Sequence, residues 1–129
     1  VSGQNSSQVS TEVRLRVDEG LELTAVITRE SAENLALTVG REVHAFIKAS
    51  SVLLSTEPGL HTSARNHLWG AIKRIHEGAV NTEVTLSISG GRTVTALITR
   101  DSAARLGLEV GAQVGAMFQA TSVILATLG

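Results

Sequence analysis

The chain repeats itself, and this repeat restricts the possible folds more than any other feature of the sequence. Residues 9–56 recur as residues 80–127, displaced by 71 positions and without a gap. The stretch Leu23–Ala32, for example, returns as Val94–Ala103. Roughly half of the aligned positions are identical, so the chain is predicted to contain two copies of one structural unit.

A short linker separates the two copies. Pro58 cannot donate to a sheet ladder and Gly59 bends freely, so Glu57-Pro58-Gly59 is predicted to end the first copy. The first repeat is therefore assigned to residues 1–58 and the second to residues 59–129. The stretch His61–Gly70 holds the only Trp and has no earlier copy in the chain. Its copy would lie before Val1.

Apolar and polar residues alternate along much of each copy, which is typical of half-buried strands. Residues 1–8 are expected to form a loop because they are rich in Ser, Asn and Gly. Short helices are predicted near Ser31–Leu37 and Ser102–Leu106, each preceded by a capping Thr. Strands are predicted at Val9–Val17, Leu21–Thr28, Glu42–Ala49, Ser51–Ser55, Leu68–Ile75, Val80–Ile88, Thr93–Thr99, Gln113–Ala120 and Ser122–Ala126.

This pattern predicts an all-β fold with short helices, in the form of two tandem OB-like five-stranded barrels. One complete copy has about five strands, with one helix between the third and the fourth, and closure into a barrel protects the strand edges. The first barrel lacks its opening strand in this chain. That strand either lies upstream of Val1 or comes from another chain, so a homo-oligomer, a dimer or a trimer, is expected.

Composition excludes several classes of function. Aromatic residues make up only 2% of the chain, so the core must be built from Val, Leu, Ile and Ala. The net charge of −1 argues against binding of nucleic acid by this chain. The chain has no Cys and no apolar run of membrane-spanning length, so a membrane partner is not expected and a reducing, cytoplasmic location is compatible. The missing initiator Met suggests a processed or excised fragment.

No catalytic constellation emerges, and the protein is predicted not to be an enzyme. The four His residues lack the spacing of a metal site, and His61 with His67 gives only two ligands. We therefore expect neither a catalytic residue nor a bound metal cation.

Small hydroxyl residues recur at the junctions between elements in both copies. Thr28 with Ser31 begins the first helix, and Thr99 with Ser102 begins the second. Helix starts and hydroxyls donate hydrogen bonds to anions, and a nearby Arg or Lys would add charge. Together these groups could hold a small tetrahedral oxyanion without catalysis. Simple N-capping is the alternative for the hydroxyls, and a surface salt bridge is the alternative for Arg65.

The central stretch resembles a known family. Thr62–Gly70, followed by Ile75–Val84, is similar to the Mop domain, which is the molybdenum-binding type of TOBE domain. Ala96–Ser102 and Ala120–Leu125 continue this resemblance, and Val9–Glu57 resembles the same domain without its opening strand. The tandem arrangement also resembles the C-terminal di-Mop region of the molybdate-responsive transcription regulator.

The resemblance implies an OB-like barrel, an oligomer, and molybdate or tungstate bound at subunit interfaces by backbone amides, hydroxyls and basic side chains. The second copy departs from the family pattern because Gln119 stands in place of the Lys. Carried over residue by residue, the family's motifs imply these oxyanion-binding residues: Thr28, Ser31, Lys48, Ala49, Ser50, Ser63, Ala64, Arg65, Asn66, Thr99, Ser102 and Thr121.

The resemblance leaves three functions open. The first is the ligand-sensing module of a molybdate-dependent transcription regulator, which would contact DNA only through a domain not present in this chain. The second is a free-standing cytoplasmic protein for molybdate storage and homeostasis. The third is a purely structural module that assembles subunits.

Overall fold

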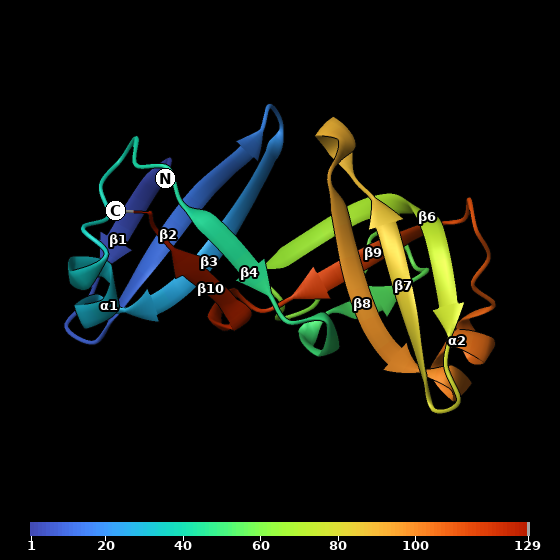
Figure 1. Cartoon of the computed structure of the whole chain (residues 1–129). Coiled ribbons are helices and arrows are strands. Elements are labelled where there is room, and N and C mark those ends of the chain that lie inside the picture. The colour runs from blue at the N-terminus through green and yellow to red at the C-terminus, as the bar shows by residue number, and fades with distance from the viewer. Residues whose placement is uncertain (129) are drawn as a thin grey trace. The chain divides into compact units, whose positions relative to one another are not determined.

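The computed structural model describes residues 1–128 of the chain, and strands dominate it (Figure 1). Two short α-helices and three single-turn 3₁₀ helices (η1–η3) connect the strands. In chain order the elements are β1 (Gly3–Ser6), β2 (Ser10–Asp18), β3 (Leu21–Thr28), α1 (Arg29–Asn34), β4 (His44–Ile47), η1 (Ala49–Ser51), β5 (Leu53–Ser55), β6 (Asn66–Glu77), β7 (Asn81–Ser87), η2 (Ser89–Gly91), β8 (Thr93–Thr99), α2 (Arg100–Leu106), β9 (Gln113–Phe118), η3 (Ala120–Ser122) and β10 (Val123–Ala126).

The chain divides into two compact units that do not coincide with the two sequence repeats. Unit 1 consists of Val1–Ile47 with Gln119–Gly129, and unit 2 consists of Lys48–Phe118. Each unit therefore contains the last segment of the other repeat. Accordingly, β10 pairs with β4 in unit 1, and β5 pairs with β9 in unit 2. The boundary at residue 58 separates the two sequence repeats. It does not separate the two compact units, because each unit contains the last segment of the other repeat.

Unit 2 is a curved five-stranded antiparallel sheet in the order β5-β9-β6-β7-β8. Strand β6 is long enough to serve two partners. Its first half, Asn66–Ala71, pairs with β9, and its second half pairs with β7. A register shift between Ile72 and Arg74 separates the two pairings and bends the strand. Apolar side chains on one face fill the core, including Ile72, Leu86 and Phe118.

Unit 1 follows the same plan with a shorter first strand. It contains a three-stranded sheet, β1-β2-β3, and a two-stranded sheet, β10-β4. The alternation along β2 buries Val13 and Leu15, as the period-two pattern predicts. The expectation of a loop over residues 1–8 is wrong at Gly3–Ser6, which pairs with Arg14–Thr11. Backbone pairing with β2 outweighs the poor strand propensity of these small polar residues.

Strand β1 also corrects how much of the first barrel is absent. Gly3–Ser6 corresponds in the repeat to residues 74–77, the end of β6. The second half of the opening strand is therefore present in unit 1. Only the half that would correspond to Asn66–Ala71 has no counterpart among the described residues. The fold class is otherwise confirmed, with OB-like barrels made mainly of strands.

Both helices have the threonine N-caps that the sequence predicts, but the residues that follow their last turns differ between the two copies. Thr28 and Thr99 are the N-caps, and each accepts a hydrogen bond from the backbone N–H three residues later. In the second copy, Gly107 adopts the left-handed conformation at φ +63° and ends α2. Ala36 occupies the equivalent position after α1 and has φ +52°. An alanine thus bears a backbone strain that the glycine avoids.

No helix in the described part of the chain is long and apolar enough to cross a membrane.

Candidate functional site

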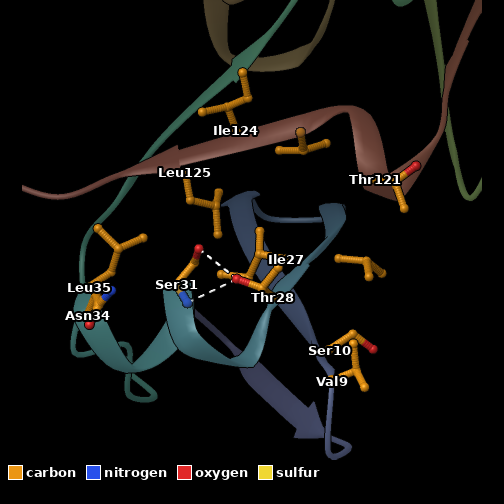
Figure 2. A pocket seen from close by; sticks show the side chains of 12 residues that line it. Val9, Ser10, Ile27, Thr28, Ser31, Asn34, Leu35, Thr121, Ile124 and Leu125 are labelled. Carbon is orange, nitrogen blue, oxygen red and sulfur yellow. Dashed lines mark hydrogen bonds between the residues drawn. The ribbon is translucent and has the colours of Figure 1, made fainter.

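A pocket of unit 1 lies between the start of α1 and strand β10 (Figure 2). It is open and has a volume of about 630 Å³. Figure 2 shows Thr28 and Ser31 on one wall, with Ile124 and Leu125 on the facing strand. The residues around it are Val9, Ser10, Val26, Ile27, Thr28, Ser31, Asn34, Leu35, Thr121, Val123, Ile124 and Leu125.

Unit 2 contains a second pocket built from the equivalent residues. Its volume is about 300 Å³, and each of its lining residues has a repeat partner around the first pocket. Ser102 corresponds to Ser31, and Leu53 and Leu54 correspond to Ile124 and Leu125. Its lining residues are Leu53, Leu54, Ile98, Ser102, Arg105 and Leu106. The pocket is therefore a duplicated feature of the fold, completed in each unit by the exchanged last strand.

A pair of hydroxyls begins the helix beside each pocket, and the serine of each pair, Ser31 or Ser102, lines the pocket itself. Thr28 Oγ1 accepts a hydrogen bond from the backbone N–H of Ser31 at 3.0 Å and donates one to Ser31 Oγ at 2.7 Å. Thr99 and Ser102 repeat this arrangement at 3.1 and 2.8 Å. Because the serine oxygen accepts from the threonine, its own proton is directed elsewhere. Each serine can therefore donate to a ligand in the pocket.

The backbone amides at the helix starts are less available than the sequence suggested. Arg29 N donates to Val9 O at 3.0 Å, and Arg100 N donates to Val80 O at the same distance. The amide of each serine is already bound by the N-cap. Capping, the alternative weighed above for these hydroxyls, is therefore real. The side-chain O–H of the serine remains as the donor that capping does not use.

Thr121 comes from a distant part of the sequence to the pocket of unit 1. It belongs to η3, which lies against β3, and it lines the same pocket as Thr28 and Ser31. The structure thus brings three of the predicted site residues together. All lining side chains of this pocket are uncharged. A dianion in it would need a cation from outside the pocket to offset the cost of leaving water.

The two predicted cations, Lys48 and Arg65, both lie in unit 2. Strands β5 and β6 flank β9 and begin at the same end of it, where Leu53 and His67 both pair with Met117. Lys48, Ala49 and Ser50 lie shortly before β5, separated from it by Ser51 and Val52, and Ser63, Ala64 and Arg65 directly precede β6. Both motifs therefore lie at one end of the sheet, on either side of β9. Lys48 and Arg65 are exposed, as a contact with an external ligand requires.

Asn66, the last residue of the Ser-Ala-Arg-Asn motif, differs from the three preceding residues of the motif in its burial. It is the first residue of β6, pairs with Phe118 and is buried. Its side chain therefore anchors the motif to the sheet. Thr62 helps to shape the same segment, since its Oγ1 accepts a hydrogen bond from Ala64 N at 3.1 Å.

Sequence reasoning missed the apolar wall of each pocket. Ile124 and Leu125 in unit 1, and Leu53 and Leu54 in unit 2, face the hydroxyl pairs. The repeat of these residues was visible in the sequence, but nothing in it indicated which helix they face. No group of three or more His, Asp or Glu suited to a metal cation occurs among residues 1–128.

Comparison with known proteins identifies the family. The TOBE domain model matches residues 1–54 and 62–125, one match for each repeat. The chain belongs to the TOBE domain family. The tandem Mop-type arrangement inferred from the sequence is thereby confirmed, and the gap between the two matches falls on the linker around Pro58.

Two solved structures show how the repeat relates to known members of the family. The cytoplasmic molybdate-binding protein ModG, solved with molybdate bound, is 44% identical and has a TM-score of 0.95, covering 99% of this chain and 92% of ModG. MopII from Clostridium pasteurianum is 37% identical with a TM-score of 0.50, and all of it is covered by 52% of this chain. One relative thus matches both TOBE units, and the other matches one.

Curated relatives extend beyond the matched region. The molybdenum transport protein ModE of Azotobacter vinelandii is 52% identical over 129 residues, which is all of this chain and 48% of that protein. This chain spans about half the length of the curated relatives it matches.

Proposed function

We propose that this TOBE chain binds molybdate, or the similar tungstate, without catalysing a reaction. The observation that carries the proposal is the duplicated pocket. In each copy a serine O–H that helix capping does not use faces an apolar wall. Support comes from ModG, which was solved with molybdate bound and whose fold matches this chain over nearly its whole length. The ModE relative from Azotobacter vinelandii is a molybdenum transport protein by name.

The hydroxyls would donate neutral hydrogen bonds to the anion, and the cations would balance its charge. Ser31, Thr121 and Ser102 supply neutral donors that fit the oxygens of a tetrahedral anion. Lys48 and Arg65 supply charge, and Arg65 adds a planar fork that can bond two oxygens at once. The motif residues Ala49, Ser50, Ser63, Ala64 and Asn66 set the backbone around these cations, while Thr28 and Thr99 hold the serines.

A homo-oligomer, a dimer or a trimer, would complete the sites. The pocket of unit 1 has no charged lining residue, and a dianion would remain uncompensated there. We propose that exposed Lys48 or Arg65 from a neighbouring copy supplies the missing charge at the subunit interface. Selectivity against sulfate then depends on cavity size, because both anions carry the same charge and shape.

Storage and homeostasis of molybdate in the cytoplasm is the role that the comparisons favour. ModG, a cytoplasmic molybdate-binding protein solved with molybdate bound, matches both units of this chain with a TM-score of 0.95. This likeness supports the free-standing binding protein, given above as the alternative, better than the sensing module of a regulator. A DNA-binding region encoded ahead of Val1 in the same reading frame would favour the regulator instead.

Calorimetric titration with molybdate, using sulfate as the control anion, tests the proposal directly. We expect heat of binding with molybdate alone. Replacing exposed Arg65 by Ala should weaken binding by about 1.5–3 kcal/mol, the value of a hydrogen bond to a charged group, and leave the fold intact. Arg92→Ala, which removes another exposed arginine of unit 2, is the matched control. Equal binding of both anions, or unchanged affinity in the Arg65 variant, would contradict the assignment.

A further inference from the structure

The two equivalent pockets differ in charge at one position. In unit 2, Arg105 lines the pocket together with Ser102. Its repeat equivalent in unit 1 is Asn34, which lines the corresponding pocket together with Ser31 (Figure 2). Every other residue that lines the unit 2 pocket has an equivalent of the same chemical class, apolar or hydroxyl, around the unit 1 pocket. One exchange, arginine for asparagine, therefore gives the unit 2 pocket a positive charge.

Helical spacing places Arg105 on the pocket side of α2. Ser102, Arg105 and Leu106 are three and four residues apart, so they share one face of the helix, and all three line the pocket. Arg100, the other arginine of α2, is not among the described residues that line it. Its repeat equivalent, Arg29, lines a different pocket of unit 1. The charge at the unit 2 pocket therefore comes from Arg105.

A salt bridge holds Arg105 beside the pocket without using all of its donors. Arg105 Nε lies 3.1 Å from Oδ2 of Asp101, which is one turn earlier in α2. A guanidinium has five N–H donors, and one carboxylate pairs with one edge of it through at most two of them. The Arg105 side chain is 80% exposed, so an anion can reach the remaining donors from solvent.

The charge changes what each pocket needs in order to bind a dianion. In unit 2, the O–H of Ser102 and the guanidinium of Arg105 are donors to the same pocket, and a charged donor binds an anion about twice as strongly as a neutral one. The unit 1 pocket has the additional hydroxyl of Thr121, but all of its lining side chains are uncharged. The unit 2 pocket can therefore offset part of the anion's charge with a residue of its own unit.

We propose that Arg105 is an oxyanion-binding residue of the unit 2 pocket and acts there together with Ser102. The unit 2 pocket thus contains its own cation, whereas the unit 1 pocket depends on a cation from outside. This inference rests on the function proposed above, and it adds a residue that the family's motifs did not indicate. Because solvent screens an exposed guanidinium, the contact is expected to change affinity by about tenfold, the low end for a hydrogen bond to a charged group.

NMR titration with molybdate reads the two pockets separately. The backbone amides of Ser31 and Ser102 lie beside different pockets, so the shift of each amide gives an apparent affinity for its own pocket. Arg105→Asn gives unit 2 the residue that unit 1 has. We expect it to weaken the affinity read at Ser102 about tenfold and to leave the affinity read at Ser31 unchanged.

Two control variants separate the cation from its surroundings. Asp101→Asn breaks the same salt bridge but keeps the guanidinium. It should retain or strengthen the affinity read at Ser102, because it removes a negative charge near the bound anion. Arg100→Asn removes a positive charge from the same helix without touching the pocket, and it should leave the affinity at Ser102 unchanged.

Unchanged affinity at Ser102 in Arg105→Asn would overturn the proposal. An equal loss in Asp101→Asn would also overturn it, because the salt bridge would then act only by supporting the helix. An equal loss in Arg100→Asn would do the same, since net charge alone would explain the effect. In each of these cases molybdate binding itself would stand. If neither serine amide of the native chain responded to molybdate, the function proposed above would fail, and this inference would fail with it.

Discussion

The hydroxyl pair at the start of α1 allows capping and ligand binding to be separated by two single substitutions. Thr28 accepts the cap bond from Ser31 N, and Ser31 Oγ receives only the proton of Thr28. Thr28→Val removes the cap acceptor and keeps the branched shape. Loss of an N-cap costs about 1 kcal/mol of stability, with a range of 0.5–2. Ser31→Ala leaves the cap in place and removes the O–H that faces the pocket.

We therefore expect opposite patterns in two assays. In urea unfolding, Thr28→Val lowers the midpoint, whereas Ser31→Ala changes stability by less than about 0.5 kcal/mol, because Ser31 is partly exposed and alanine favours the helix. In calorimetry, Ser31→Ala weakens molybdate binding by about 0.5–1.5 kcal/mol, which is the net worth of one hydrogen bond. Ser102→Ala should repeat this behaviour in unit 2, where the same bonds occur.

The reasoning would be refuted by a Ser31→Ala variant with native molybdate affinity and reduced stability. The serine would then serve the helix alone, and the duplicated hydroxyl pairs would be caps with no part in the ligand site. Asn34→Ala is a useful control, because Asn34 lines the same pocket without belonging to the hydroxyl pair.

Two further predictions follow from the repeat. Ala36 and Gly107 occupy equivalent left-handed positions, and a Cβ at Gly107 meets nothing within 4 Å, so only backbone strain separates the two residues. Ala36→Gly should raise stability and Gly107→Ala should lower it, each by about 1 kcal/mol in urea unfolding, and a destabilising Ala36→Gly would contradict this account. For assembly, light scattering is expected to give a dimer or trimer mass, and a monomer mass that does not change with concentration would argue against subunit-interface sites.

The sequence predicted most of the elements because local signals agreed with tertiary packing. Period-two alternation located β2 and β3, and the Thr-x-x-Ser pattern located both helix starts and their caps. Strand β1 escaped prediction because Gly3–Ser6 has no apolar alternation. Its pairing is dictated by β2 and by the bonds of Val1 to Arg41 and Gly40, which are non-local.

The candidate site was only partly visible for a similar reason. The hydroxyls stood out because they recur at fixed spacing in both copies. Their arrangement around a pocket depends on β10 and β5, which reach their pockets from the far end of the other repeat. Spacing along the chain carries no information about such a partner. The positions of Lys48 and Arg65 at one end of β9 likewise depend on which strands flank β9.

The symmetry of the repeat allows the last strands to be exchanged between the two units. Leu53 pairs with Met117 in unit 2, and Ile124 pairs with Phe46 in unit 1. These two pairings become identical when either copy is displaced onto the other. An unexchanged chain would form the same register, with Leu53 opposite Phe46. Because the side-chain pairs are so alike, pairing energy alone discriminates weakly between the two connections. The short connections through η1 and η3 must then decide which unit each last strand joins. For this reason the sequence predicts the barrel but does not predict which copy supplies its last strand.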